Sequence, residues 1–163
     1  MTNENREIEL DRMRFTKNTL SSGLALLAIL FNVFFFVSIY KSDVSSYYYN
    51  ILIGASILYN LIFMLAAFLA SEGIKNYKVA YSWLLILLGI IQIARIFIYP
   101  MTAHAATVTI KDQVITVMET PQFVRCVVYL CASAVCCLVS AVIGFKKSSD
   151  LSGHLAAMAK KAA

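Results

Sequence analysis

Four polar side chains interrupt the most apolar stretches of this 163-residue chain, and they are the first candidates for chemistry. Asn32, Asn60 and Gln92 are amides, which exchange hydrogen bonds but are poor nucleophiles and acids. Arg95 carries a fixed positive charge and shares a helical face with Gln92 and Tyr99 through i, i+3 and i+7 spacing. We therefore predict a polar cluster of Asn32, Asn60 and Gln92, and a ligand or partner contact at Gln92, Arg95 and Tyr99.

Arg95 admits two interpretations. It lies about 6 Å before Tyr99 along a helix, so its side chain could snorkel to the nearby interface or pair with Glu119 or Asp112. Alternatively, it binds an anion or a partner protein, because an ionisable residue inside a membrane is costly and usually functional.

Catalytic constellations are missing from the sequence. The apolar stretches contain no Asp or Glu, with Glu72 at an edge, whereas ion-coupled transporters usually bury an acid. His104 and His154 fall on opposite sides of the predicted bundle. The cysteines all lie in the last apolar stretch, without CxxC or metal-ligand spacing, at Cys126, Cys131, Cys136 and Cys137. We expect no catalytic residue, no cofactor, no metal and no enzymatic activity.

The elements that position these residues are four apolar stretches. With 60% hydrophobic residues and a mean hydropathy of +0.74, the chain exceeds the apolar content of soluble domains. Each stretch reaches the roughly 20 residues that cross a bilayer as a helix. We predict an all-α integral membrane protein, a four-transmembrane-helix bundle in one domain spanning 1–163. The predicted spans are 20–40, 49–71, 80–99 and 123–145.

Each span carries a seam of small or polar residues spaced by about one or two helical turns. Lipid does not drive helices together, so close backbone approach and interhelical hydrogen bonds must do so. These seams predict one compact bundle. They comprise Ser21, Ala25, Ala28 and Asn32; Ser56, Asn60, Ala67 and Ala70; Ser82, Gly89 and Gln92; and Cys126, Ser133, Cys137, Ser140 and Gly144.

The distribution of basic residues predicts the orientation. Ten of the fourteen Lys and Arg lie in the N-terminal segment 1–19, the 72–79 loop and the tail 146–163. Cytoplasmic loops carry the excess of Lys and Arg, so both termini are predicted to be cytoplasmic in a multi-pass protein of the cell membrane. The charged N-terminal segment does not resemble a signal peptide.

The loop 100–122 is then extracytoplasmic. Its sequence TVTIKDQVITV alternates with a period of two and predicts a β-hairpin with its tip at Asp112–Gln113. Val108 would oppose Val117 and Ile110 would oppose Ile115, giving an apolar face that acts either as a lid or as a docking edge.

The tail has an apolar face at Leu151, Leu155 and Met158. It is predicted either as a short helix on the membrane surface or as a segment without fixed structure.

The function expected from these observations is non-enzymatic. An accessory or scaffold subunit of a larger membrane assembly, such as a transporter, is the leading hypothesis. The alternatives are a small oligomeric transporter or channel for a polar or anionic solute, and a membrane thiol redox enzyme. The expected partners are the lipid bilayer and a larger integral membrane protein, with a homo-oligomer as a further option. The net charge of +5 is spread over span flanks, so nucleic acid is not expected.

Overall fold

The computed structural model describes residues 17–39, 47–110 and 113–162, with the side chains of 47–50, 52, 108–110, 113–115 and 161–162 left aside. Four helices are long and apolar enough to cross a membrane. They are α2 (Thr19–Ile39), α3 (Tyr47–Lys75), α4 (Val79–Ile98) and α6 (Thr120–Ala162). The predicted four-helix membrane bundle is therefore confirmed at this level.

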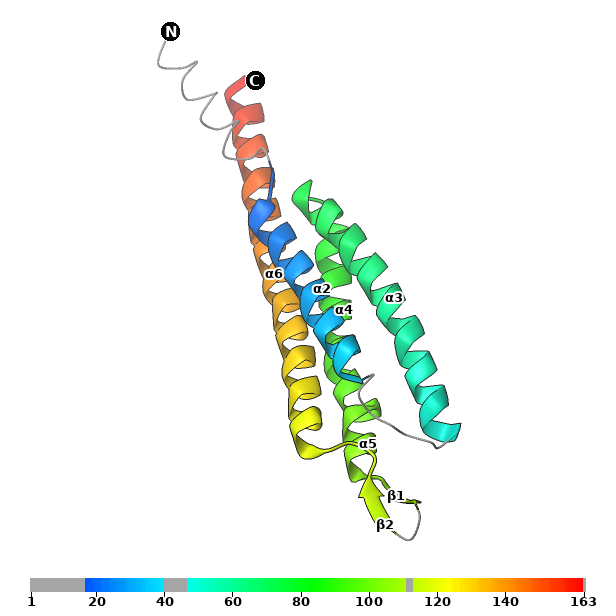
Figure 1. Cartoon of the computed structure of the whole chain (residues 1–163). Coiled ribbons are helices and arrows are strands. Elements are labelled where there is room, and N and C mark those ends of the chain that lie inside the picture. The colour runs from blue at the N-terminus through cyan, green and yellow to red at the C-terminus, as the bar shows by residue number, and fades with distance from the viewer. Residues whose placement is uncertain (1–16, 40–46, 111–112, 163) are drawn as a thin grey trace.

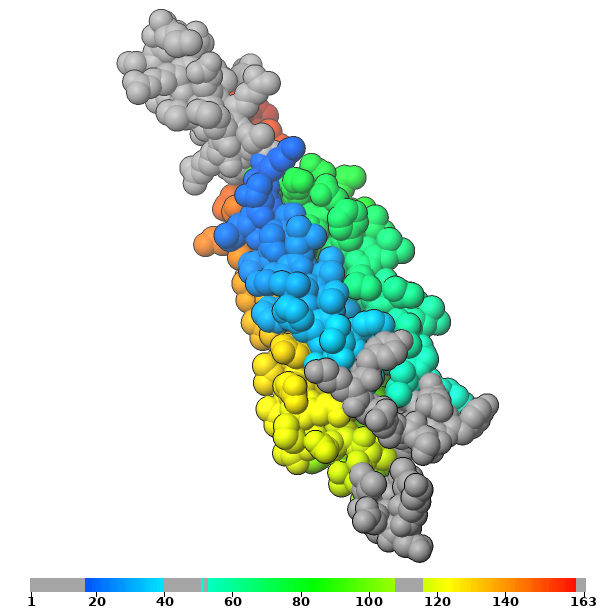
Figure 2. Space-filling view, viewed as in Figure 1, coloured from blue at the N-terminus to red at the C-terminus, as the bar shows by residue number. Residues whose placement is uncertain are grey.

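The four helices form an elongated bundle (Figure 1). Helix α2 packs on α6 and α3, and α4 packs on the same two helices, so α2 and α4 are diagonal neighbours. The contact between α3 and α4 is the least extensive of these four. In the face shown in Figure 2, α2 and α3 lie side by side over the bundle interior. We call the end with the strands the hairpin end, and the opposite one, where α6 projects, the tail end.

The seams form the helix contacts, as predicted. All sixteen seam residues are buried. Ser21 on α2 and Ser140 on α6 each donate from the hydroxyl to the other's carbonyl oxygen, at 2.6 and 2.7 Å. The hydroxyl of Ser22 lies 2.8 Å from that of Ser71 on α3. Short polar side chains thus join α2 to both neighbours while letting the backbones approach closely.

Helices α3 and α4 are joined by a tight turn at the tail end. The amide of Lys78 donates to the carbonyl of Gly73, and the amide of Tyr77 donates to that of Ile74. Tyr77 has a φ of 58°, the left-handed conformation that ends many helices in this hydrogen-bond pattern. Gly73 is required here because a Cβ on it would lie 2.1 Å from the Tyr81 ring.

At the hairpin end, a short helix α5 (Pro100–Ala105) precedes the strands β1 (Thr107–Ile110) and β2 (Gln113–Thr116). The predicted register is wrong: Ile110 pairs with Gln113 and Val108 with Ile115. The partner of each β1 residue lies two positions earlier in the sequence than predicted. Because no Gly marks the tip, the sequence signal for its position is weak.

The last predicted span and the tail form one continuous helix, and the predicted end of the span at residue 145 stays a prediction. Helix α6 continues without a break from Thr120 to Ala162, past the predicted end at residue 145. Pro121 lies in the first turn, where proline is tolerated, no proline follows it, and Gly153 sits inside the helix with open space around it. Lys, Leu, Ala and Met, which favour helix, dominate the sequence that follows.

Gly144 tests the close packing of α6 on α3 and α4. A Cβ at this position would lie 2.3 Å from Cδ1 of buried Ile74 and 2.6 Å from Oγ of Ser82. Gly144→Ala should lower the free energy of unfolding by about 2 kcal/mol, since overpacking of a close contact costs 1–3 kcal/mol. Gly23→Ala is the matched control, because nothing lies within 4 Å of that site. It should leave stability unchanged or raise it by about 0.5 kcal/mol. Equal effects of the two changes in a reversible unfolding assay would contradict this packing.

Candidate functional site

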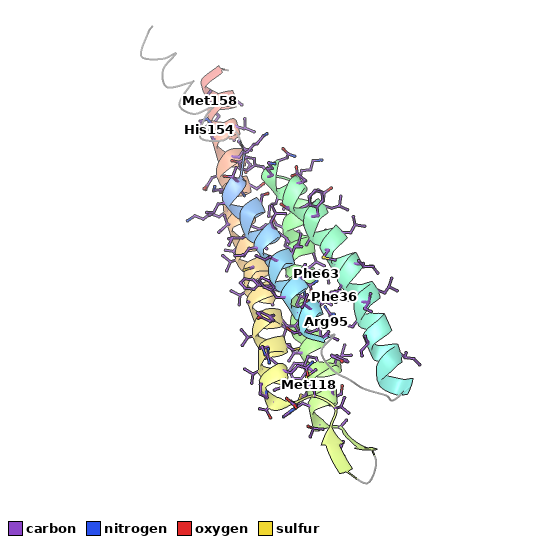
Figure 3. All side chains as sticks on the ribbon, viewed as in Figure 1. Phe36, Phe63, Arg95, Met118, His154 and Met158 are labelled. Atoms are coloured by element: carbon purple, nitrogen blue, oxygen red, sulfur yellow. The ribbon has the colours of Figure 1, made fainter. Side chains whose placement is uncertain are left out.

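Arg95 on α4 lies inside the bundle, between its middle and the hairpin end (Figure 3). Only 6% of it is exposed. Its Nη1 donates to Oδ1 of Asn60 on α3 at 2.7 Å and to Oδ1 of Asn32 on α2 at 3.3 Å. Its Nη2 donates to the hydroxyl and the carbonyl oxygen of Ser56 on α3. One guanidinium group therefore links three of the four helices.

Two aromatic rings enclose the same guanidinium. Its Cζ lies 4.4 Å from the ring centroid of Phe35 on α2 and 4.4 Å from that of Tyr59 on α3. A cation over an aromatic face is attracted by the negative face of the ring, typically by about 0.5–2 kcal/mol per ring. The charge is therefore held by neutral oxygens at its edge and by aromatic faces.

Gln92, one turn before Arg95, extends the network to the fourth helix. Its Nε2 donates to Oδ1 of Asn32 at 3.0 Å and to Oγ of Ser133 on α6 at 3.3 Å. Ser133 in turn donates to the carbonyl oxygen of Ala28 on α2. The structure thus brings the predicted polar residues together, but Asn60 joins the other two amides through Arg95 and not by a direct bond.

The positive charge has no acidic partner in the described part of the chain. The salt bridge found there joins Lys75 to exposed Glu72 at the tail end. The expectation that Arg95 snorkels or pairs with Glu119 is wrong, because its guanidinium is turned into the bundle and bonds to Asn32, Asn60 and Ser56. The other proposed partner, Asp112, lies outside the described residues.

Several polar atoms around this charge have no hydrogen-bond partner. They are Nδ2 of Asn32, Nδ2 of Asn60, Oε1 of Gln92 and the hydroxyl of Tyr59. Each is buried, and an unmade hydrogen bond in such a place costs about 1–3 kcal/mol. The cluster therefore has spare donors and a surplus positive charge, which together favour an added acceptor.

A pocket of about 240 Å³ adjoins the cluster between α3 and α4. Its lining is almost wholly apolar, and the lining residues that carry polar groups are Arg95, Ser56, Tyr59 and Tyr99. The rest of its lining is aliphatic, from Ala55, Ile91, Ala94 and Ile98. Its small volume, below the roughly 300–1,000 Å³ of drug-sized sites, suits a small group or the end of a longer molecule.

The remaining predicted contacts lie outside this pocket. Val117 is buried with Tyr99, Ala103 and Met118 in the chain's own core, and its amide donates to the carbonyl oxygen of Ala106. It covers the bundle and is not free to meet a partner. Val108 is described in its backbone only, as the Cα partner of Ile115.

The cysteines and histidines do not converge into a reactive site. Cys126 and Cys137 are buried, whereas Cys131 is exposed, and all four cysteines are free thiols. His104 stacks on Phe123, with ring centroids 4.6 Å apart, and its Nδ1 lies 3.1 Å from the carbonyl oxygen of Met118. In the described residues, no three His, Cys, Asp or Glu side chains are placed to hold a metal ion.

Sequence reasoning missed the two aromatic residues of the cluster. Phe35 follows Asn32 by three positions, and Tyr59 follows Ser56 by three, so each shares a helical face with a recognised seam residue. That spacing was available in the sequence. The sequence does not show how far α2, α3 and α4 are shifted along the bundle axis relative to one another. That shift brings both rings to the level of Arg95.

The fold and its cluster define a class, a four-helix membrane bundle with a buried arginine that has no acidic partner among the described residues. No family model matches the sequence, and neither the curated proteins nor the solved structures contain a match to it.

Asn60 tests whether the network stabilises the bundle. Asn60→Leu removes the acceptor of the 2.7 Å bond from Arg95 Nη1 and leaves Nη1 with the longer bond to Asn32. The free energy of unfolding should fall by about 2 kcal/mol, the usual scale for a hydrogen bond to a charged group. Ile62→Leu, a volume-conserving change at an exposed position on the same helix, is the control and should change stability little. An Asn60→Leu protein as stable as the control would show that the network is energetically silent.

Proposed function

We propose that this chain is a non-enzymatic accessory or scaffold subunit of a larger membrane protein assembly, for example a transporter. The observation that supports this role best is the length of α6. The hydroxyl of Ser148 donates to the carbonyl oxygen of Tyr77, in the turn that closes the bundle at the tail end. Helix α6 continues from there to Ala162. Residues 149–162, which we call the arm, add about 20 Å of helix.

The arm projects from the bundle, and Figure 3 places His154 and Met158 on it. Leu155 is 60% exposed and Met158 is 43% exposed. Leu155 and Met158 are three residues apart and share one face of the arm, which a partner surface could bury. Lys160 at its far end adds positive charge, so an apolar surface with an acidic rim on another protein would complement the arm. An accessory subunit needs such an element to reach its partner.

The orientation completes this proposal. The excess of Lys and Arg in the N-terminal segment, the 72–79 loop and the tail supports a cytoplasmic tail end. The arm then meets a cytoplasmic surface of the partner, while the strands lie on the other side of the membrane.

A labelling experiment tests the orientation. In a cysteine-free background, a cysteine replacing Asp112 should react with a membrane-impermeant maleimide added to intact cells. A cysteine replacing Lys75 should react only after the cells are opened. The reverse labelling pattern would contradict the proposed membrane orientation and would place the arm outside the cytoplasm.

The partner should be recovered with the protein from native membranes. We expect the full chain, extracted in mild detergent, to co-purify with one larger membrane protein in fixed stoichiometry. Leu155→Ser combined with Met158→Ser should reduce that recovery at least about tenfold, because it removes the apolar contact of the arm. Ala156→Ser combined with Ala159→Ser, also at exposed arm positions, should leave it unchanged. Purification of the wild-type chain without an enriched partner would overturn the accessory role.

A transporter or channel for a polar or anionic solute is the second candidate. It is favoured by one observation, the grouping of Asn32, Asn60, Gln92 and Arg95 within the bundle. Saturable uptake of a solute by liposomes that contain only this protein would promote it over the accessory role.

A further inference from the structure

We propose that the pocket between α3 and α4 binds the acidic head of an amphiphilic anion, an apolar chain that ends in a carboxylate or a phosphate. Arg95 supplies the opposite charge. This inference is independent of the accessory role, because it concerns the hairpin half of the bundle and not the arm.

The charge of Arg95 is the first reason. The guanidinium is buried and bonded to neutral oxygens, and no acid of the described chain lies within salt-bridge distance. Neutral acceptors satisfy its protons but leave the net charge in place. In the low-dielectric interior an anion gains far more from that charge than it does in water. A buried arginine without a counter-charge therefore favours an anion from outside the chain.

The two ends of the guanidinium are differently engaged. Nη1 is held by the amide oxygens of Asn32 and Asn60 inside the bundle. Nη2 bonds to Ser56, which lines the pocket together with Arg95 itself. An anion in the pocket can therefore take the place of the Ser56 oxygens at Nη2 without disturbing the amides. Fixed Nη1 bonds keep the group oriented, which lowers the entropy lost on binding.

The pocket also supplies a second donor. Tyr59 lines the pocket, and its buried hydroxyl has no hydrogen-bond partner, so it can donate to an oxyanion that reaches it. The hydroxyl of Ser56 can do the same once it is released as an acceptor. An acid group with two or three oxygens would thus meet a charged donor and hydroxyl donors at once, the combination that makes strong, short hydrogen bonds.

The aliphatic lining identifies the rest of the ligand. Apart from its polar atoms, the pocket is lined by Ala55, Ile91, Ala94 and Ile98. Ile98 is 60% exposed on the outside of the bundle, so the apolar wall continues onto the surface that faces lipid. A fully hydrated small anion would gain nothing from these walls. An acid group that carries an apolar chain would bury that chain against them.

The depth of the site suits a ligand from the bilayer. Arg95 lies 17 residues beyond Lys78, about 25 Å along α4, whereas the hydrocarbon core is about 30 Å thick. The pocket is therefore near the head groups of the leaflet at the hairpin end. A fatty acid or an anionic phospholipid of that leaflet can place its acid group at this level while its chain stays in the membrane.

Binding can be measured with the full chain in nanodiscs of pure phosphatidylcholine. We expect oleate to bind and to raise the unfolding temperature, whereas methyl oleate, which has the same chain without the charge, does not. A second measurement, with phosphatidylglycerol in place of oleate, tests whether the site accepts a phospholipid head group. Acetate and inorganic phosphate ask whether a free anion suffices. Stabilisation by acetate or phosphate equal to that by oleate would overturn the amphiphilic part of the proposal.

The decisive variant is Asn60→Asp. It puts a carboxylate where an amide oxygen now lies 2.7 Å from Nη1, so the chain supplies its own counter-charge without loss of shape. The folded bundle should persist, and oleate binding should weaken at least about tenfold. Arg95→Gln should abolish binding if it folds. Arg125→Gln removes an exposed positive charge near the same end and is the control, with unchanged binding expected. Oleate binding that survives in folded Asn60→Asp at the wild-type affinity would refute the role of Arg95.

Discussion

The solvation of one buried guanidinium is the interaction on which this bundle depends. A positive charge within a membrane helix is costly, by about 2.5–3.5 kcal/mol at the helix centre in insertion measurements, and burial inside the bundle keeps Arg95 from reaching water. Here α2 contributes Asn32, α3 contributes Asn60 and Ser56, and two aromatic rings cover the faces. None of these helices could solvate Arg95 alone, so the charge requires their association. The Arg95 charge, which is costly to bury in α4, therefore fixes the positions of α2 and α3 relative to α4.

The serine and small-residue seams make that arrangement possible. Ser21 and Ser140 exchange hydrogen bonds near the tail end, and Gly144 lets α6 approach Ile74 and Ser82. Such contacts are short-range and demand nearly touching backbones, because lipid supplies no hydrophobic drive. Packing is therefore closest on the faces that α6 shares with α2 and α4. The looser contact of α3 with α4 leaves the pocket beside Arg95.

The sequence predicted the elements well and their relative positions poorly. Hydropathy located all four spanning helices, and small-residue spacing identified seams that are buried throughout. Arg95 was recognised as unusual, but its surroundings depend on the heights of three helices, which no local pattern encodes. The register of β1 and β2 failed for a similar reason, since a tip without Gly carries little turn information. The polar residues after position 145 hide the continuity of α6 in the sequence, because a change in polarity does not end a helix whose residues favour that backbone.

The arm and the Arg95 pocket lie in opposite halves of the molecule, and they affect the bundle differently. The arm leaves its apolar residues beyond the bundle, where another protein can cover them without altering the helix packing. The Arg95 pocket lies between α3 and α4, so an anion bound there would replace the Ser56 oxygens at Nη2 and would itself lie between the two helices. A ligand that binds only the folded bundle raises its stability by mass action. Helix α3 contributes Asn60 and Ser56 to the cluster, yet its contact with α4 is the least extensive of the four helix contacts. The packing of α3 on α4 is therefore the contact most sensitive to occupancy of the pocket. Anion binding at the hairpin end would therefore act first on the position of α3, while the arm on α6 keeps its place.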